Sequence, residues 1–358
     1  MRRILTCIAI LAGILILSMA SAQAYYVRIK DLTGSPTPPN PVTVSGKVTN
    51  TSPLTINDGS GDLILAGLSA SSNDFLVVKG NWDGSLLTVD GHAEAYVGAA
   101  RTQMVYVPAG DFLMGSPSGV GNSNERPQHS VYLPGYWIGK HTVTRGEYRQ
   151  FMESGGYEDS TYWSDEGWAW RSYYYRTEPA YWAPEQNWSS GTFTQTDNHP
   201  VVGVSWYEAE AFCNWAGGKM PTEAQWEKGA RWDAGLQHPR VYPWGDIWDA
   251  EKCNNRDDTL YVGAQTAPVA SYPAGVSPYG LHDMAGNVSE WVYDWYSATY
   301  YSQTPPEGWI DPEGPTTGNY RVLRGGHFDS LQSFCRSAYR SYGNHSALLG
   351  YCGFRVCR

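Results

Sequence analysis

The chain has 358 residues, of which 39 are glycine, 22 are proline, 16 are tryptophan, 26 are tyrosine and 8 are phenylalanine. This much glycine and proline without a repeat argues against a helical bundle or collagen, whereas 42% hydrophobic residues predict a folded chain of two or three domains. The excess of 35 acidic over 25 basic residues argues against a nucleic-acid partner, because such binding needs clustered cations that neutralise phosphates.

The first 24 residues are typical of a secretory signal peptide. Two arginines follow Met1, an apolar run extends from Ile4 to Ala20, and small residues precede a cleavage point after Ala24. A retained membrane anchor is the alternative, but the run is short, no stop-transfer flank follows it, and no later segment resembles a membrane span. We therefore expect an exported protein that is secreted, periplasmic or at the cell surface.

Cysteine usage is consistent with an oxidising compartment, where disulfides persist. Cleavage would remove Cys7 and leave an odd number of thiols, namely Cys213, Cys253, Cys335, Cys352 and Cys357. At least one of them is then free or pairs with another chain. No pair has C-x-x-C spacing, so neither a zinc site nor a thioredoxin-like centre is indicated.

Residues 25–102 predict a small all-β module. A proline-rich stretch at 35–41 is typical of a linker, and short β-rich runs separated by turn residues follow at 42–48, 54–56, 63–65, 75–78 and 86–89. A barrel of the oligonucleotide/oligosaccharide-binding (OB-like) type is the specific expectation. The segment has no basic, aromatic-rich face, which favours a spacer or docking module over a ligand site.

From Met104 onward the sequence is dense in Trp, Tyr and Gly and predicts little regular secondary structure. Two amphipathic helices with capping-box signals are expected at 144–154 and 205–216. The many aromatic residues at 157–188 either fill the core of a fold with few strands or face a ligand.

A series of motifs marks this second segment. In chain order they are VYVPAGDFLMGS (105–116), ERP (125–127), NHPVVGVSW (198–206), GKMPTEAQWE (218–227), YPWG (242–245), DMAGNVSEW (283–291), RGG (324–326) and GFR (353–355). Together they resemble the formylglycine-generating enzyme, or sulfatase-modifying factor, family over residues 103–358. The resemblance implies an elaborated C-type-lectin-like fold, which is an α+β domain with much irregular structure, and it says nothing about residues 25–102.

The resemblance also implies a copper-dependent oxidase, because the family's catalytic members use two cysteines that bind copper and oxidise a substrate cysteine to formylglycine. Counted from the glycine pair at 325–326, those positions fall on Ser330 and Cys335, so a single candidate catalytic thiol remains. A hydroxyl is a poor substitute for a soft thiolate ligand of Cu(I). His327 and Ser289 also replace the family's active-site serine and motif tryptophan. Copper is therefore expected only if the oxidase activity persists.

Calcium is the other metal that the resemblance implies. Four positions match a family Ca²⁺ site built from two side-chain and two backbone oxygens, namely Asp283, Gly286, Val288 and Glu290. A second family site would begin at Asn254 and Asn255, with Asp257 or Asp258 replacing an absent downstream aspartate. The resemblance further implies a disulfide between Cys213 and Cys357, and leaves Cys253 or Cys352 as the candidate partner of Cys335.

Three functions are compatible with the sequence. The first is a ligand-binding scaffold for a protein or small molecule, whose C-terminal segment resembles the variable region of retroelement-diversified proteins. Its ligand face would comprise His327, Phe328, Asp329, Ser330, Leu331, Phe334, Tyr342, Asn344, His345 and Tyr351. The second is an oxidoreductase of the same family that modifies a sulfatase or a small molecule, and the third is a structural domain docked through its β module.

The residue repertoire of the C-terminal segment bears on the first function. Diversification at adenines of Asn codons cannot produce Glu, Lys, Met, Trp or Gln, and within 327–334 and 341–352 only Gln332 is of these types. A near-copy of the 3′ coding sequence beside a reverse transcriptase would support diversification. A neighbouring sulfatase or biosynthetic cluster would support enzymology.

Overall fold

The computed structural model describes residues 102–183, 195–257 and 265–358 in full, and the backbone of short strands within residues 1–101. Of these strands, β1 (Thr6–Ile8) pairs with β2 (Ile16–Ser18), and β4 (Leu54–Asn57) pairs with β5 (Asp62–Leu65). Both pairs are antiparallel. The runs predicted at 54–56 and 63–65 coincide with β4 and β5, and the run at 42–48 lies outside the described residues.

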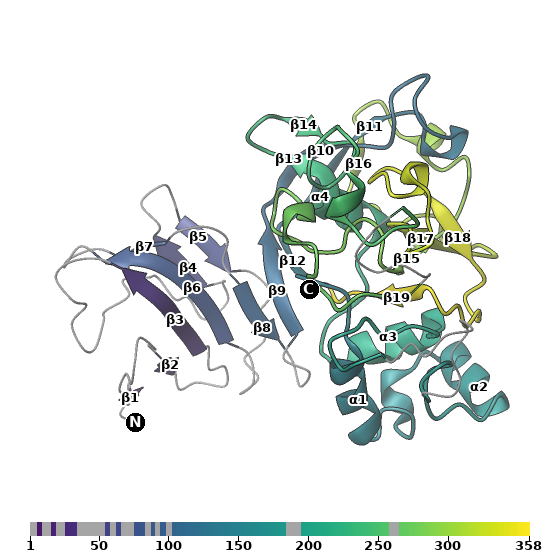
Figure 1. The fold of residues 1–358 in the computed structure, drawn as a ribbon, viewed down its shortest axis with the longest axis horizontal. Coiled ribbons are helices and arrows are strands. Elements are labelled where there is room, and N and C mark those ends of the chain that lie inside the picture. The colour runs from purple at the N-terminus through teal and green to yellow at the C-terminus, as the bar shows by residue number, and fades with distance from the viewer. Residues whose placement is uncertain are drawn as a thin grey trace.

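A six-stranded sheet joins the N-terminal strands to the rest of the chain (Figure 1). Its spatial order is β12 (Tyr136–Gly139), β9 (Thr102–Val107), β8 (Glu94–Val97), β6 (Phe75–Trp82) and β3 (Tyr26–Thr33), with β7 (Leu87–Val89) paired to β6. The β3–β6 pair is parallel and the other pairs are antiparallel. The expected domain boundary at 102/103 therefore falls after the first residue of β9, which pairs with β8, and the division into domains and the OB-like barrel stay predictions.

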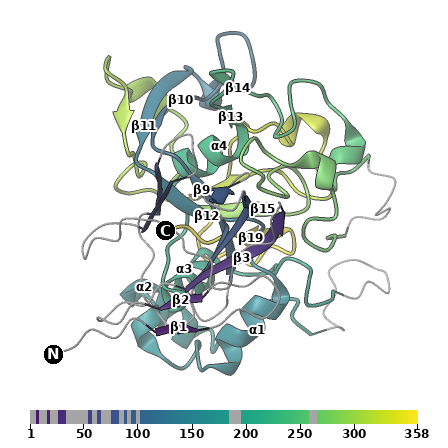
Figure 2. The ribbon, with the colours of Figure 1, turned by 90° about the vertical axis from the view of Figure 1, so that its left-hand side faces the viewer.

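Four helices form in the C-terminal domain, namely α1 (Arg145–Glu153), α2 (Asp165–Tyr173), α3 (Trp206–Trp215) and α4 (Glu223–Arg231). The two helices predicted from capping boxes are confirmed as α1 and α3. The Glu147 carboxylate accepts a hydrogen bond from the backbone N–H of Thr144 at 2.7 Å, and Glu208 does the same for Ser205 at 2.8 Å. Figures 1 and 2 place α1, α2 and α3 on one side of β15 and β19 and α4 on the other.

The remaining strands are short. One sheet has the order β18 (Ser341–Gly343), β17 (Arg321–Arg324), β15 (Ser289–Trp295) and β19 (Cys352–Phe354), and β15 runs parallel only to β19. A second contains β10 (Gly110–Met114), β11 (His129–Leu133) and β16 (Trp309–Ile310), and β13 (Trp232–Asp233) pairs with β14 (His238–Pro239). Short 3₁₀ helices occur at Ser123–Glu125, Ser160–Tyr162, Ala250–Lys252, Pro273–Gly275, Tyr301–Gln303 and Gln332–Phe334.

Aromatic rings fill much of the core where regular structure is sparse. Phe212 of α3 stacks on Tyr148 of α1 with ring centroids 5.4 Å apart, and it meets Phe354 of β19 edge-on at the same distance. Tyr157 and Trp163, from the aromatic-rich stretch, are buried in this cluster. Aromatic side chains therefore join the helices to the sheet.

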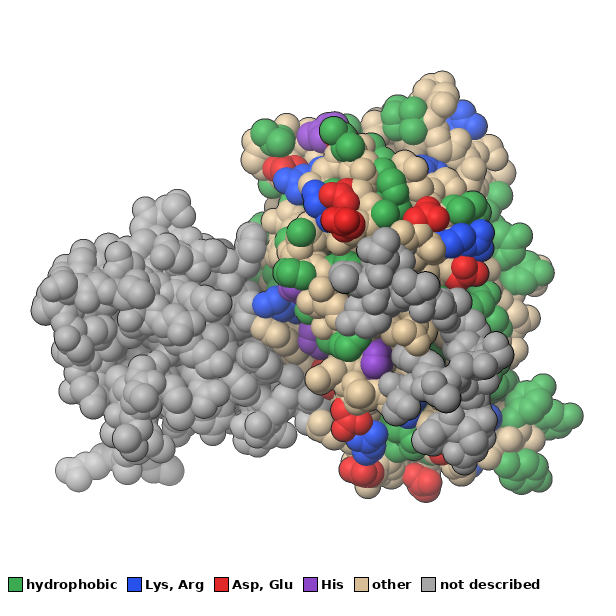
Figure 3. All heavy atoms as spheres, viewed as in Figure 1, with side chains coloured by type: hydrophobic (Ala, Val, Ile, Leu, Met, Phe, Trp, Pro, Cys, Tyr) green, Lys and Arg blue, Asp and Glu red, His purple; other side chains and the backbone are tan. Residues whose placement is uncertain are grey.

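The described surface carries mixed charge. On the face shown in Figure 3, Lys and Arg side chains lie near Asp and Glu side chains. Within the described ranges, no helix combines the length and apolar character that crossing a membrane requires.

Buried ion pairs connect the loops to the core. Three arginines that are at most 2% exposed each contact a buried glutamate, namely Arg324 with Glu227, Arg340 with Glu223 and Arg355 with Glu290. The Arg340 guanidinium donates to both carboxylate oxygens of Glu223 at 2.7 Å. Such bidentate geometry offsets part of the large cost of removing both charges from water.

Replacing Arg340 by methionine should lower the free energy of unfolding by about 3–5 kcal/mol, because Glu223 would remain buried without its cation. The matched control is Arg149→Met, since the ion pair of Arg149 with Asp197 is largely exposed and should contribute at most about 1 kcal/mol. Equilibrium unfolding in guanidinium chloride measures both changes. Equal losses in the two variants would contradict a special role for the buried pair.

Candidate functional site

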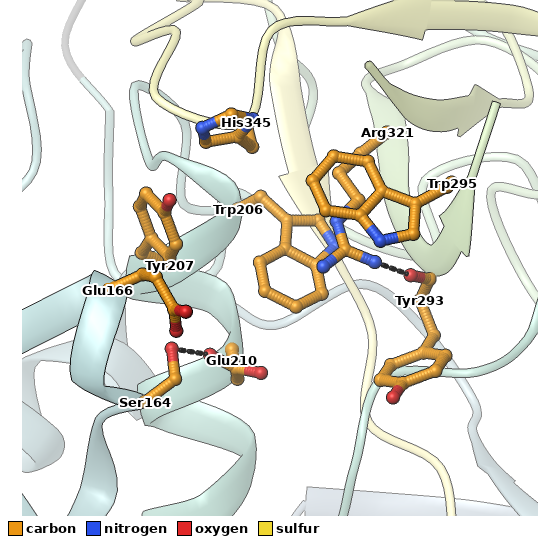
Figure 4. Close-up of a pocket in the computed structure, with 9 residues that line it drawn as sticks. All are labelled: Ser164, Glu166, Trp206, Tyr207, Glu210, Tyr293, Trp295, Arg321 and His345. Carbon is orange, nitrogen blue, oxygen red and sulfur yellow. Dashed lines mark hydrogen bonds between the residues drawn. The ribbon is translucent and has the colours of Figure 1, made fainter. Parts of the chain in front are cut away.

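A cavity of about 400 Å³ opens between the helices α2 and α3 and the sheet that contains β15 and β17. It is lined by Ser164, Glu166, Trp206, Tyr207, Glu210, Tyr293, Trp295, Arg321 and His345 (Figure 4). The volume lies in the range of ordinary small-molecule sites. Aromatic rings and charged groups both reach its wall, so the cavity can combine apolar contact with specific polar recognition.

The cationic group of this cavity is the guanidinium of Arg321. Its carbon lies 3.6 Å from the ring centroids of both Trp206 and Trp295, so an indole covers each face of the guanidinium plane. Strand register creates this contact, because Trp295 of β15 pairs with Arg321 of β17. Trp206 is held by a 2.9 Å hydrogen bond from its indole N–H to the backbone oxygen of Val292.

The hydrogen bonding of Arg321 is incomplete. Among the described residues, only the backbone oxygen of Tyr293 accepts from its guanidinium, through Nη1 at 2.5 Å. Its Nε is buried without an acceptor. Burial lowers the pKa of Arg321 to about 10, which leaves the group cationic at neutral pH.

Two carboxylates face the cation across the cavity. Ser164, the N-cap of α2, donates a hydrogen bond of 2.6 Å to Glu210 of α3, while Glu166 lies in the first turn of α2. Burial raises the pKa of Glu210, and the nearby charge of Glu166 adds to this. The helices α2 and α3 therefore supply the acidic side of the cavity and the sheet supplies the basic side (Figure 4).

His345 is the only residue of the predicted ligand face that lines this cavity. Its ring meets Tyr207 and Trp295 edge-on at 5.2 and 5.6 Å, and its Nδ1 is buried without a hydrogen-bond partner. Burial, followed by the charge of Arg321, lowers the pKa of His345. Nearby, Tyr342 is 49% exposed and Asn344 is also exposed.

Other predicted ligand-face residues gather around the loop that follows β17. His327 stacks on Tyr351 with ring centroids 4.5 Å apart, and burial lowers the pKa of His327 to about 4. Asp329 forms an ion pair of 2.9 Å with Arg256. Leu331 and Phe334 also belong to this loop and are 43% and 39% exposed.

Two residues that the sequence placed on the ligand face do not reach the surface. Phe328 and Ser330 are each 2% exposed. The Ser330 hydroxyl accepts a hydrogen bond of 2.9 Å from the backbone N–H of His327, so it stabilises the loop from within. The ligand face is therefore smaller than the sequence suggested, and its exposed members are divided between this loop and β18.

The two positions that correspond to the copper-binding thiols are both buried. Ser330 is 2% exposed. Cys335 is fully buried in a small cluster with Cys253 and Ala285, and Trp244 and Trp248 pack against this cluster. Cys352 belongs to a different hydrophobic cluster. Of the two partners considered for Cys335, the structure therefore brings Cys253 into its cluster.

Cys213 and Cys357 are also buried, and the structure holds both as thiols. Burial raises the pKa of the Cys213 thiol, and the nearby Cys357 raises it further. Burial likewise raises the pKa of Cys357 to about 12. The two side chains belong to different hydrophobic clusters, and the disulfide between them stays a prediction.

The residues of the first predicted calcium site form a tight turn before β15. Asp283 has a φ of +58° and is buried, and its Oδ2 accepts from the backbone N–H of Ala270 at 2.8 Å. Burial raises the pKa of Asp283. The Glu290 carboxylate accepts from Arg355 at 2.6 Å through each oxygen and from Trp226 at 2.9 Å. These bonds occupy Glu290 without a metal.

The second predicted calcium site lies against the first. The backbone N–H of Asn287 donates to the backbone oxygen of Asn254 at 2.8 Å, and a side chain at Gly286 would collide with that oxygen. The side-chain oxygen of Asn254 is buried without a hydrogen-bond partner, whereas that of Asn255 accepts from Asp257. No group of three His, Cys, Asp or Glu residues suited to a metal occurs in the described part of the chain.

Comparisons with known proteins address the origin of this architecture. The family model of the sulfatase-modifying factor enzyme 1-like domain matches residues 93–358. A formylglycine-generating enzyme from Thermomonospora curvata is 34% identical over 290 residues, covering 70% of this chain and 92% of the enzyme. The hercynine oxygenase of Mycolicibacterium smegmatis is 34% identical, covering 68% of this chain and 58% of that protein. The serine/threonine-protein kinase pkn1 of Chlamydia caviae is 36% identical, with coverage of 72% and 38%.

The chain thus spans less than two thirds of the length of the kinase and the oxygenase. Among solved structures, PvdO from Pseudomonas aeruginosa has a TM-score of 0.55 and 27% identity, covering 73% of this chain and 95% of PvdO. Treponema denticola variable protein 1 has a TM-score of 0.53 and 22% identity, with coverage of 72% and 94%, and shows the fold alone. The α+β, C-type-lectin-like architecture is therefore confirmed, and the chain belongs to the sulfatase-modifying factor family.

Proposed function

We propose that this protein is an exported, ligand-binding member of the sulfatase-modifying factor family that does not oxidise cysteine to formylglycine. The carrying observation is that a buried serine, Ser330, occupies one of the two positions expected to hold copper-binding thiolates. Cu(I) is held by soft sulfur ligands, and a hydroxyl that is already hydrogen-bonded within its loop is a poor replacement.

The surroundings of Cys335 support the same proposal. Its side chain is fully buried beside Cys253 and Ala285, so a substrate peptide cannot approach the sulfur without rearrangement of the loop. A buried cysteine in an apolar cluster behaves as a small hydrophobic residue, and in an exported protein it is also suited to a disulfide. We therefore assign Cys335 a structural role.

A ligand-binding role is supported by the exposed groups of the same region. Leu331 and Phe334 project from the loop after β17, and Tyr342 projects from β18. Loops on a rigid scaffold commonly carry binding function, and an aromatic-rich surface provides contact area with little loss of side-chain entropy. The ligand would be a protein or a small molecule.

The copper proposal is tested with the reduced, purified mature protein. Titration with Cu(I) against a competing chelator should show no tight site that depends on Cys335, and oxygen uptake with a cysteine-containing sulfatase peptide should stay at background. Cys335→Ser should match the wild type in both assays, as should the control Cys352→Ser.

The relatives named formylglycine-generating enzyme support the alternative, an oxidoreductase of the same family. Tight Cu(I) binding and turnover that both disappear in Cys335→Ser, but persist in Cys352→Ser, would establish that alternative and refute the present proposal.

Calcium is proposed as a structural cofactor of the two adjoining turns. If calcium binds, oxygen atoms of residues 283–290 would hold it at the first predicted site, and oxygen atoms of residues 254–255 would hold it at the second. The buried, unpartnered oxygen of Asn254 and the buried carboxylate of Asp283 fit a hard cation, which prefers carboxylate, amide and backbone oxygens.

Removing calcium should therefore destabilise the protein. At a calcium concentration about 100 times the dissociation constant, the metal would add about 2.7 kcal/mol, or roughly 5–10 °C in melting temperature. Thermal unfolding in the presence of EGTA, and again after calcium is restored, measures this shift in melting temperature. Asn254→Ala should reduce the shift. The control Asn214→Ala should retain it, because Asn214 lies on the exposed surface. A melting temperature that does not respond to EGTA would rule the metal out.

Export and disulfide formation can be tested together by mass spectrometry of the protein recovered from outside the cytoplasm. The intact mass should correspond to a chain that begins after Ala24. A non-reducing peptide map should show Cys213 linked to Cys357, and Cys253 linked to Cys335, with Cys352 left as the odd thiol. An unprocessed N-terminus or five alkylated thiols would contradict this part of the proposal.

A further inference from the structure

We propose that the cavity between α2, α3, β15 and β17 binds a small zwitterion of the amino-acid class, with its carboxylate on Arg321 and its ammonium group at Glu210 and Glu166. Trp295 and Ser289 lie at opposite ends of β15, and the cavity lies at the Trp295 end. Tyr351 contacts the other end, through a hydrogen bond from the Ser289 N–H. This binding site is therefore separate from the loop that carries His327, and it does not depend on whether the protein is an oxidase.

The carboxylate position follows from the hydrogen bonding of Arg321. Two indoles cover the faces of its guanidinium, so only the edge of the group can meet a ligand. Nη1 already donates to the backbone oxygen of Tyr293 and Nε is buried without an acceptor, while no described residue accepts a hydrogen bond from Nη2. A guanidinium edge with unused donors matches a carboxylate, which accepts two parallel hydrogen bonds from it.

The ammonium position follows from the opposite wall. Glu210 accepts one hydrogen bond, from Ser164, and a carboxylate has capacity for several more. Glu166 lines the same cavity as Glu210, and its negative charge adds to the raised pKa of Glu210, which burial chiefly causes. An ammonium group with three donors would offset both negative charges and satisfy both carboxylates.

The charge of the lining residues selects a zwitterion over a simple ion. Arg321 contributes one positive charge and the two glutamates contribute two negative charges, while burial favours the neutral form of His345. A purely anionic ligand would lie near two carboxylates, and a purely cationic one would leave the Arg321 edge without an acceptor. Only a ligand that carries both groups satisfies both walls.

The aromatic residues argue against a sugar as the preferred ligand. Sugar sites need an open aromatic face, but Arg321 already covers one face of Trp206 and one face of Trp295. Trp206 is also only 2% exposed. Tyr207 and Tyr293 remain at the rim, where they can contact the side chain of an amino acid.

The test uses calorimetric titration of the full mature chain with a panel of small, aliphatic, aromatic, acidic and basic L-amino acids, and with common monosaccharides. The tightest amino acid is then compared with its amide, which lacks the carboxylate, and with its N-acetyl form, which lacks the ammonium. Removal of either the carboxylate or the ammonium group should weaken binding about tenfold or more, because hydrogen bonds between charged groups are then lost.

Variants assign the two walls. Arg321→Gln should weaken binding of the amino acid about tenfold or more but leave the affinity for its amide unchanged. Glu210→Gln should likewise weaken binding of the amino acid but leave the affinity for its N-acetyl form unchanged. The controls Arg149→Gln and Glu153→Gln change exposed residues of the same types on α1 and should bind as the wild type does. Because Arg321 packs on Trp206, circular dichroism and a melting curve must first show that Arg321→Gln is folded. If it is not, Glu210→Gln and the derivative series decide alone.

Three results would overturn the proposal. They are no binding by any amino acid at millimolar concentration, equal affinity for the free amino acid and both derivatives, or binding of a monosaccharide alone. Copper binding and oxygen uptake are measured separately, so failure here leaves the proposed function untouched.

Discussion

The irregular part of this fold depends on charges that are buried in pairs. Arg340 and Arg355 come from C-terminal segments with little regular structure. Arg340 pairs with Glu223, the first residue of α4, and Arg355 pairs with Glu290, which lies on β15. Each pair joins segments that are far apart in sequence, and each carboxylate receives two hydrogen bonds from its arginine. Because an unpaired charge at these depths costs several kcal/mol, the loops have few alternative positions. This constraint fixes the positions of the two arginine-bearing segments against α4 and β15.

Local signals explain how much of the fold could be predicted. Thr144 with Glu147, and Ser205 with Glu208, place both partners of a capping box within one turn, so α1 and α3 were visible in the sequence. Thr222 and Gln225 form the same kind of box at the start of α4, a helix that the sequence analysis did not predict. Strand pairing has no such local signal. β15 pairs with β17 across a long connection, so its register had to be taken from the structure.

The cavity could not be predicted for the same reason. Trp206, Trp295 and Arg321 are far apart in sequence, and only the start of α3 and the β15–β17 register bring them together. His345 was predicted from the sequence as part of the ligand face, but the other residues of that predicted face do not line the cavity. The burial of Phe328 and Ser330 was equally invisible, because an irregular loop has no periodicity from which the inward side chains can be identified.

The cavity and the two positions that correspond to the family's copper-binding thiols lie in different parts of this scaffold. Residues 327 and 330 lie in the loop after β17. The stacking of Arg321 between Trp206 and Trp295 depends instead on the Trp295 end of β15 and on α3. Ser330 is not among the residues that line the cavity, and its hydroxyl stabilises its own loop through the hydrogen bond from the His327 N–H. Because the cavity takes no lining residue from the loop at 327–334, a scaffold of this kind can carry a charged cavity whether or not that loop supports redox chemistry.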